Sequence, residues 1–244
     1  MISLICVYNN KEYLDEILLK SLKKQDNFEF IPVDNNTHDT FTSASSALNH
    51  GSLKAKGKYL MFVHQDVEFL EEYSFKLLEE QLDNLNNLGM AGVAGKSGKS
   101  REVLTNILHG IPPAPAGKHK INEPEKVETI DECLMIVPRE LFEKIQFDEE
   151  VCSGWHLYGV DYCLTLKNLN YNNYVLPLTV HHHSNASSYN EEYFHTLKKL
   201  FKKHSNESTI YTTMNNWHSN YPLLLQRFLD SPLWTLKQFL KRLT

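Results

Sequence analysis

Strand-like and helix-like segments alternate along the first half of the chain, and this alternation limits the fold more than any other feature. Three apolar runs typical of buried strands occupy residues 2–7, 28–33 and 58–63. Apolar side chains at helical spacing occupy residues 11–25, 42–56 and 71–88, and Gly89 follows in the place of a helix C-cap. This alternation predicts an α/β fold with a mixed, mostly parallel sheet and helices on both faces. Such sheets bind ligands beyond the carboxyl ends of their strands.

The second half of the chain is less regular at first. Residues 96–130 contain four prolines and show no clean period, which favours a mobile substrate loop, with a plain surface excursion as the alternative. Patterning then predicts strands at residues 129–137 and 172–180 and helices at residues 138–145 and 159–171. From residue 189 the pattern is helical. We therefore expect a domain of residues 1–188 and a C-terminal helical extension of residues 189–244.

Composition narrows the class of protein. The formal net charge is −5, so we expect no nucleic-acid partner. No run approaches the ~18 consecutive apolar residues of a membrane span, and no basic leader opens the sequence, so we expect a cytoplasmic protein. The cysteines Cys6, Cys133, Cys152 and Cys163 have neither zinc spacing nor the pattern of a disulfide framework, which favours buried thiols.

Polar residues follow three of the predicted strands. They are Tyr8 and Asn9, then Asp34, Asn35 and Asn36, then His64 and Asp66. Because the carboxyl ends of parallel strands share one edge of a sheet, these side chains could receive a base, a ribose and a metal-bound phosphate. No glycine-rich phosphate loop follows the first strand. The phosphate charge would then be met by a metal on carboxylate and imidazole ligands.

Six segments occur in an order that resembles glycosyltransferase family 2. They are ISLICVYNN, PVDNN, ALNHGSLKAKGKYLMFVHQDV, ETIDECLMIVPRELFEKIQFDEE, GWHLYGVDYCLTLKNLNY and LPLTVHHHS. The resemblance covers residues 1–188 and points to a bacterial branch with His-Gln-Asp in place of Asp-x-Asp. It implies a GT-A fold, with transfer of a sugar from a nucleoside-diphosphate sugar, first of all a UDP-sugar, to a hydroxyl of a glycan, glycolipid or glycoprotein. It also implies Mn²⁺ or Mg²⁺ as the cofactor.

The resemblance assigns donor contacts to residues near the strand ends. It implies that Tyr8 and Asp34 contact the uracil and the ribose, and that Asn35 and Asn49 line the same pocket. His64 would contact the ribose or the phosphate, because an imidazole suits magnesium poorly. Gln65 would belong to the same donor site.

Two motifs supply the expected metal ligands. Asp66 matches the last position of Asp-x-Asp and would bind the metal that bridges the diphosphate, the alternative being a carboxylate that caps a turn. The histidines at 181–183 match the late histidine of the family. Since side chains alternate along an extended chain, either His182 or the pair His181 and His183 faces the site. The resemblance favours His182, and an ordinary solvated turn is the alternative.

The expected general base is missing. In inverting members of the family an aspartate takes the proton from the acceptor hydroxyl, and the resemblance places that position at Gly159. Either Asp161 is the base through a shifted register, or His156 or Asp131 replaces it, or transfer is slow or absent. We take Asp161 as the first candidate. Asp131 could also bind hydroxyls of the donor sugar, and Trp155 and His156 could form a wall of the acceptor site.

Other classes stay open beside the enzyme. Loss of the acid at position 159 would leave a nucleotide-sugar-binding module without catalysis. A nucleotidyltransferase also uses a metal and a nucleotide, but its glycine-rich phosphate loop is missing here. Residues 231–244 combine apolar and basic side chains at helical spacing, which is compatible with peripheral membrane contact or self-association. A helix packed on its own domain is the alternative.

Overall fold

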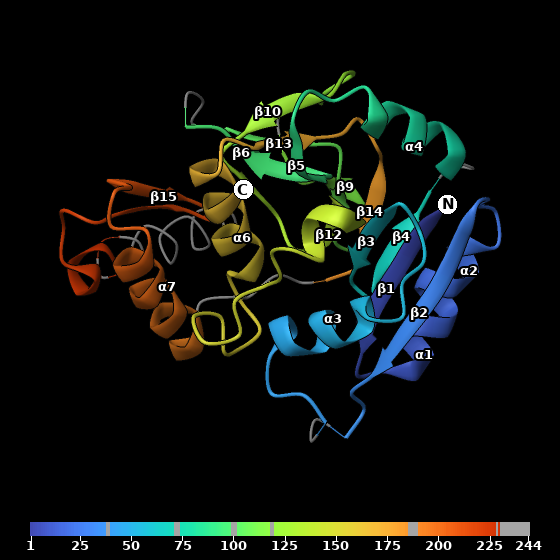
Figure 1. The fold of residues 1–244 in the computed structure, drawn as a ribbon. Helices are drawn as coiled ribbons and strands as arrows, with labels where there is room; N and C mark the ends of the chain where they lie inside the picture. Colours follow the sequence, from blue (N-terminus) through green and yellow to red (C-terminus); the bar gives the residue numbers. More distant parts are fainter. Residues whose placement is uncertain are drawn as a thin grey trace.

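A seven-stranded mixed sheet forms the centre of the protein (Figure 1). The computed structural model describes residues 1–37, 40–70, 74–98, 102–117, 120–184, 190–227 and 229. In spatial order the strands are β10 (Glu125–Val127), β13 (Asn172–Val175), β5 (Leu88–Gly92), β12 (Leu134–Pro138), β3 (Tyr59–Val63), β1 (Ile2–Tyr8) and β2 (Phe28–Asp34). Strands β12 and β10 run opposite to the others. The sheet is therefore mixed and largely parallel, as the alternation predicted.

Helices cover both faces of this sheet (Figure 1). The N-terminal helix runs through α1 (Lys11–Tyr13), a π-helical segment η1 (Leu14–Leu19) and α2 (Lys20–Leu22). The other helices are α3 (Ala44–Ser52), α4 (Phe75–Asp83), α5 (Arg139–Phe142), α6 (Tyr158–Asn168) and α7 (Glu191–Lys203). Consecutive residues of β1 point to opposite faces, so Leu4 packs in one apolar cluster with Leu18 and Ile5 in another with Ala47. Burying one leucine or isoleucine contributes roughly 1.5–3 kcal/mol, so these clusters hold the helices on the sheet.

Side-chain caps set the first residue of two helices near the carboxyl edge of the sheet. Asn10 Oδ1 accepts a hydrogen bond from the N–H of Tyr13 at 3.1 Å, and Ser43 Oγ accepts one from the N–H of Ser46 at 3.2 Å. Each cap satisfies an N–H group that has no partner inside the helix. Asn10 begins its helix two residues after β1, so the helix N-terminus is held close to the end of that strand.

The helix predicted at residues 71–88 ends earlier than the sequence indicated. Helix α4 ends at Asp83 with Asn84 as its C-cap, so the prediction that Gly89 ends the helix is wrong. Gly89 lies inside β5, where a Cβ would come within 2.9 Å of the Cβ of Tyr171. The close approach of the chain after α6 therefore requires a glycine at this position.

Short strands occupy much of the segment that the sequence left irregular. Strands β11 (Thr129–Ile130), β6 (Ala94–Lys96) and β7 (Val103–Thr105) form one small sheet. Strands β4 (Val67–Phe69), β14 (Val180–His182), β8 (Leu108–His109) and β9 (Ala114–Pro115) form another. The strand predicted at residues 129–137 is split, because residues 131–133 form a turn between β11 and β12. This turn takes Asp131 and Glu132 out of the sheet.

The C-terminal part shares the core of the rest and is not helical throughout. Helix α7 is followed by a hairpin of β15 (Thr209–Tyr211) and β16 (Asn216–His218). Trp217 is fully buried and donates to Tyr193 Oη at 2.9 Å, in the same apolar cluster as residues of α3 and α6. The expected boundary after residue 188 therefore does not separate two cores. Residues 231–244, for which the sequence pattern predicted a helix, lie outside the described ranges.

Among the described residues, none of the helices is long and apolar enough to span a bilayer.

Candidate active site

The carboxyl ends of β1 and β2 bring Tyr8 and Asp34 together. The two residues are partners in the parallel pairing, and Tyr8 Oη donates to Asp34 Oδ2 at 2.9 Å. Asp34 Oδ1 also accepts from the N–H of Asn36 at 2.9 Å. This bond, with that from Tyr8, holds the pKa of the exposed Asp34 carboxyl below its usual value. The pair therefore presents an ionised carboxylate and a phenol ring at the strand ends.

Gln65 ties the loop after β1 to the turn after β3. Its Oε1 accepts hydrogen bonds from the N–H groups of Asn9 and Asn10 at 3.1 and 3.0 Å, and its Nε2 donates to Asn9 Oδ1 at 2.7 Å. The sequence analysis placed Gln65 in the binding site of the donor sugar nucleotide. In the structure its amide is engaged by the chain itself, so the residue first of all holds two loops of the site in register.

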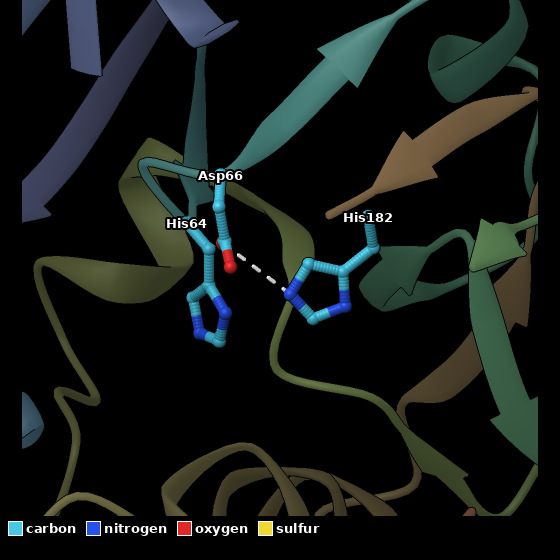
Figure 2. Close-up of side chains that lie close together, drawn as sticks. All are labelled: His64, Asp66 and His182. Atoms are coloured by element: carbon cyan, nitrogen blue, oxygen red, sulfur yellow. Dashed lines mark ion pairs between the residues drawn. The ribbon is translucent and has the colours of Figure 1, made fainter. Parts of the chain in front are cut away.

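His64, Asp66 and His182 converge from two elements that are far apart in the sequence. Figure 2 shows His64 and Asp66 on the turn between β3 and β4, with His182 reaching toward Asp66 from β14. Strand β14 pairs antiparallel with β4, with His182 opposite Val67, and the N–H of His183 donates to Asp66 O at 3.0 Å. This register sets His182 Nε2 3.3 Å from Asp66 Oδ1. The His64 and His182 rings lie 5.6 Å apart.

The three side chains influence one another's protonation. Burial acts to raise the pKa of Asp66, but the hydrogen bond from His182 and the nearby His64 hold it below its usual value. Burial acts to lower the pKa of His182, and Asp66 outweighs it and raises that pKa. Burial, followed by the proximity of His182, lowers the pKa of His64. Asp66 is therefore ionised near neutral pH and His64 is a neutral imidazole.

The donor set of this cluster fits a divalent transition metal. One ligand atom from each of His64, Asp66 and His182 can be chosen so that all lie within 4.8 Å of one another. Mg²⁺ takes oxygen ligands, whereas imidazole nitrogen suits transition-metal dications. Of the two expected cations, Mn²⁺ therefore suits this set better.

A second cluster contains His181 of β14 and His183, the residue that follows this strand. His183 Nε2 lies 2.8 Å from Glu68 Oε2, and His181 Nδ1 lies 3.5 Å from the same oxygen. His181 Nε2 is 2.9 Å from Gly110 O. The alternation expected for an extended chain thus divides the three histidines, with His182 beside Asp66 and the other two beside Glu68.

Two cavities meet at the His64 and Asp66 turn. The smaller, of about 440 Å³, is lined by Val7, Asn9, Asn35, Ala44, Leu48, Phe62, Val63, His64, Gln65, Asp66, Glu132, Trp155 and Tyr158. The larger, of about 650 Å³, extends over β6, β7, β8, β9 and residues 212–214, and also takes in Asp131, His156 and His182. His64, Asp66, Glu132 and Trp155 line both cavities. We call these four residues the junction.

Asp131, His156 and Trp155 all reach the larger cavity. Asp131 Oδ2 accepts from Thr213 Oγ1 at 2.6 Å, and its Oδ1 accepts from the N–H of Cys133 at 3.1 Å. The His156 ring packs against Tyr193 at 5.9 Å, and burial lowers its pKa. Trp155 is 38% exposed. The structure thus brings together the residues predicted for the sugar and acceptor side.

Asn35 and Asn49 have structural partners. Asn35 lines the smaller cavity, but its amide closes a loop, with Nδ2 donating to Phe41 O at 3.2 Å and Oδ1 accepting from Phe41 N at 3.0 Å. Asn49 is not a lining residue of either cavity. Its amide binds the backbone of Phe147 and the Glu149 carboxylate, which holds α3 to the segment after α5 and leaves it no donor-binding role in this structure.

Asp161 does not reach the site, and this position corrects the prediction that it is the base. Its side chain is 3% exposed, with Oδ2 2.7 Å from Lys203 Nζ and Oδ1 2.8 Å from His204 Nε2. Both partners come from the end of α7. Because both oxygens of the buried carboxylate are engaged, Asp161 joins α6 to α7 and lines neither cavity.

Glu132 is the site residue that sequence reasoning missed. Its Oε1 accepts a hydrogen bond from the N–H of Gly159 at 3.0 Å, and its side chain belongs to the junction. Burial raises its pKa to about 8. The only sequence signal was the pair Asp131 and Glu132, which interrupts an apolar run that otherwise reads as one strand.

The fold is shared with solved glycosyltransferase structures. GalNAc-T7 with UDP, GalNAc and Mn²⁺ matches with a TM-score of 0.59 and 11% identity over 83% of this chain. The mannosyltransferase PcManGT from Pyrobaculum calidifontis with GDP-Man and Mn²⁺ gives 0.57 and 13% over 86%. S. aureus TarS with UDP-GlcNAc gives 0.56 and 16% over 83%. The chain spans 47%, 65% and 66% of these proteins, respectively. The likeness confirms the predicted GT-A fold.

Sequence comparison identifies the family. A protein of Fuscovulum blasticum, named ATP synthase subunits region ORF 6, is 29% identical over 181 residues, which are 71% of this chain and 70% of that protein. The model of the glycosyltransferase-like family matches residues 3–204. This match covers most of the chain, and the protein therefore belongs to the glycosyltransferase-like family.

Proposed function

We propose that this protein is a metal-dependent glycosyltransferase that moves a sugar from a nucleoside-diphosphate sugar to a hydroxyl of a glycan, glycolipid or glycoprotein precursor. One observation carries the proposal: an ionised Asp66, paired with His182, lies at the junction of two cavities. A transferase needs a donor and an acceptor on either side of one reacting centre. The paired cavities supply that arrangement.

The smaller cavity is the proposed donor site. It begins at the carboxyl ends of β1 and β3, where open α/β sheets bind ligands. Val7 and Leu48 give it apolar walls for a base, and Asn9 adds a polar side chain. Tyr8 and Asp34 do not line it and would meet the nucleotide only as it extends past the strand ends. A UDP-sugar is the first donor to test, because UDP accompanies two of the structural neighbours.

Asp66 and His182 are the proposed ligands of Mn²⁺, with His64 beside them. When bound, the cation supplies positive charge to the diphosphate that leaves with its electron pair. Asp66 keeps the carboxylate that this requires, and the backbone pairing of β14 with β4 keeps His182 against it. His64, neutral and 3.5 Å from Tyr158 Oη, orients the wall between the cavities.

The larger cavity is the proposed acceptor side. Trp155 supplies an exposed ring on which a sugar can stack, while Asp131 and His156 offer polar contacts to hydroxyl groups.

A cytoplasmic location, and contact with a membrane or a second copy through residues 231–244, stay predictions from the sequence.

Release of nucleoside diphosphate tests the proposal. Purified protein is mixed with UDP- and GDP-sugars, Mn²⁺ and a panel of glycan acceptors, and the diphosphate is measured. We expect release that requires Mn²⁺ and falls at least ~100-fold in His182→Ala, with the matched His183→Ala on the other face close to the wild type. Binding without release from any donor and acceptor would instead identify a nucleotide-sugar-binding module.

A further inference from the structure

Glu132 occupies a place where an acceptor hydroxyl and a donor sugar could both approach its carboxyl. It lies in the turn between β11 and β12 and is one of the four residues of the junction. Its neighbours there are Asp66, next to which the diphosphate is proposed to bind, and Trp155 on the acceptor side. The turn is anchored on both sides, since the N–H of Asp131 donates to Ala94 O at 2.9 Å and His64 N donates to Cys133 O at 3.0 Å.

The Glu132 side chain also fills the space that a side chain at position 159 would need. A Cβ on Gly159 would lie 3.0 Å from Glu132 Cγ and 2.8 Å from Met135 Sδ. Contacts this short require the Met135 and Glu132 side chains to shift, so a side chain at position 159 competes with the Glu132 side chain for the same space. The chain thus has no acid on α6 at this point, but brings one to the same space from the facing turn.

Backbone groups hold the Glu132 carboxyl in position. The N–H of Gly159 donates to Oε1 at 3.0 Å, at the start of α6. Leu157, just before this helix, has a φ of 66°, a left-handed conformation that turns the chain into the helix. A carboxyl fixed by a helix N-terminus is preorganised, because it loses little freedom when a substrate arrives.

We propose that Glu132 is the general base of the transfer reaction, a role that rests on the glycosyltransferase function proposed above. Its carboxylate takes the proton from the acceptor hydroxyl as the oxygen of that hydroxyl bonds to C1 of the donor sugar. The bond between C1 and the phosphate oxygen breaks, and its electron pair leaves with the nucleoside diphosphate. The products are the glycoside, the nucleoside diphosphate and protonated Glu132, which returns its proton to water.

The surroundings of Glu132 suit this role. Burial raises its pKa to about 8, Asp131 adds to the rise, and the N–H groups of residues 157–159 partly oppose it. The other ionisable groups around it are Cys133 on the same turn, Tyr158 and Cys163 on α6, Cys152 before α6, and His64 and Asp66 across the junction. A base is most effective when its pKa lies close to the working pH.

Glu132→Gln separates catalysis from structure. The amide oxygen can still accept the hydrogen bond from Gly159, so the fold and the donor site remain, but the amide cannot take a proton. With any donor and acceptor that the wild type uses, we expect kcat to fall about 100-fold or more while the donor KM changes less than about threefold. We also expect the wild-type kcat to rise through about pH 8, with no such rise in the variant.

A swap of the two positions provides the second test. Glu132→Gly removes the Cγ that lies 3.0 Å from a Cβ at position 159, so in the double variant Glu132→Gly with Gly159→Asp only the flexible Met135 side chain has to shift to admit an acid on α6. We expect the double variant to exceed Glu132→Gly in kcat by about tenfold or more. Gly159→Asp alone meets Glu132 and does not gain activity.

The outcomes separate this proposal from the function on which it rests. A wild type that releases no nucleoside diphosphate from any donor overturns both. An active wild type whose kcat is matched within about threefold by a folded Glu132→Gln overturns the role of Glu132 alone. A Glu132→Gln protein that loses donor binding together with kcat assigns the residue to structure and also overturns it.

Discussion

The turn after β3 and the turn before β12 each place one carboxylate at the junction, and the two environments act on protonation in opposite directions. Burial acts to raise the pKa of both acids. At Asp66 the hydrogen bond from His182 and the proximity of His64 overcome burial, and the pKa lies below its usual value. At Glu132 only backbone N–H groups oppose burial, and the pKa rises to about 8.

The difference follows from which elements face each turn. Strand β14 brings an imidazole to Asp66, whereas α6 offers Glu132 the N–H groups of its first turn and the neighbouring Asp131 repels a second negative charge. Two acids whose pKa values are driven apart can divide the work of a reaction. In the proposed reaction Asp66 stays ionised and Glu132 exchanges a proton.

Removing the ionised partner should have the largest effect. In Asp66→Asn we expect turnover to fall by at least ~100-fold and its dependence on Mn²⁺ to disappear, because the carboxylate is the proposed charged ligand of the cation. The matched control is Glu68→Gln, which lies in β4 beside His181 and His183 and lines neither cavity, and which should retain most of the activity. Equal turnover and equal Mn²⁺ dependence in Asp66→Asn and the wild type would show that the ionised Asp66 carboxylate is not needed for the reaction.

A third buried carboxylate, that of Asp161, is expected to contribute to stability and not to catalysis. Asp161 is buried between Lys203 and His204, so Asp161→Asn leaves His204 without its charged partner in the core. We expect a loss of about 3 kcal/mol in the free energy of unfolding, or roughly 6–12 °C in Tm. Thermal unfolding with a surface control, Lys11→Gln, would measure it. A Tm within a degree of the wild type would show that the ion pair does not hold α7.

Neutralising Glu132 should stabilise the protein, in contrast to Asp161. The folded pKa of about 8 lies above the unfolded value, so the folded protein keeps a proton that the unfolded chain loses as pH rises. The cost is absent below about pH 4, grows through neutral pH and is complete above about pH 8. We therefore expect Glu132→Gln to gain about 1–3 kcal/mol near pH 8 and little near pH 4. Unfolding curves at several pH values measure this gain, and one that is equal at all pH values would contradict the raised pKa.

The strand ends away from the junction should matter least. Tyr8→Phe removes the hydrogen bond to Asp34 and leaves the ring, which typically costs about 1 kcal/mol or a few-fold in affinity. Titration of UDP against the two proteins measures this change. A loss of 100-fold or more would instead place the nucleotide directly on the Tyr8 hydroxyl.

The sequence predicted the strand ends well, because residues that follow parallel strands must share one edge of a sheet. Tyr8 meets Asp34 for this reason, and the alternation along β14 sets His182 apart from its two neighbours. The interiors of the helices and the apolar strands followed from periodicity alone.

The part that could not be predicted depends on contacts between distant segments. Glu132 gains its position only when the glycine at position 159 allows α6 to approach the turn before β12. Asp161 is occupied only because α7, later in the chain, returns two basic side chains to α6. Asn49 likewise finds its partners about 100 residues later in the chain, in the segment after α5. No local pattern contains these approaches.

Three consecutive histidines make the pairing of β14 with β4 unusually tolerant of errors in register. A shift of one residue along a strand exchanges the faces of all its side chains. Here such a shift would move His181 or His183 into the place of His182, opposite Val67, so an imidazole would still face Asp66. The connection of residues 176–179 could therefore gain or lose one residue in evolution without depriving the carboxylate of its ring partner.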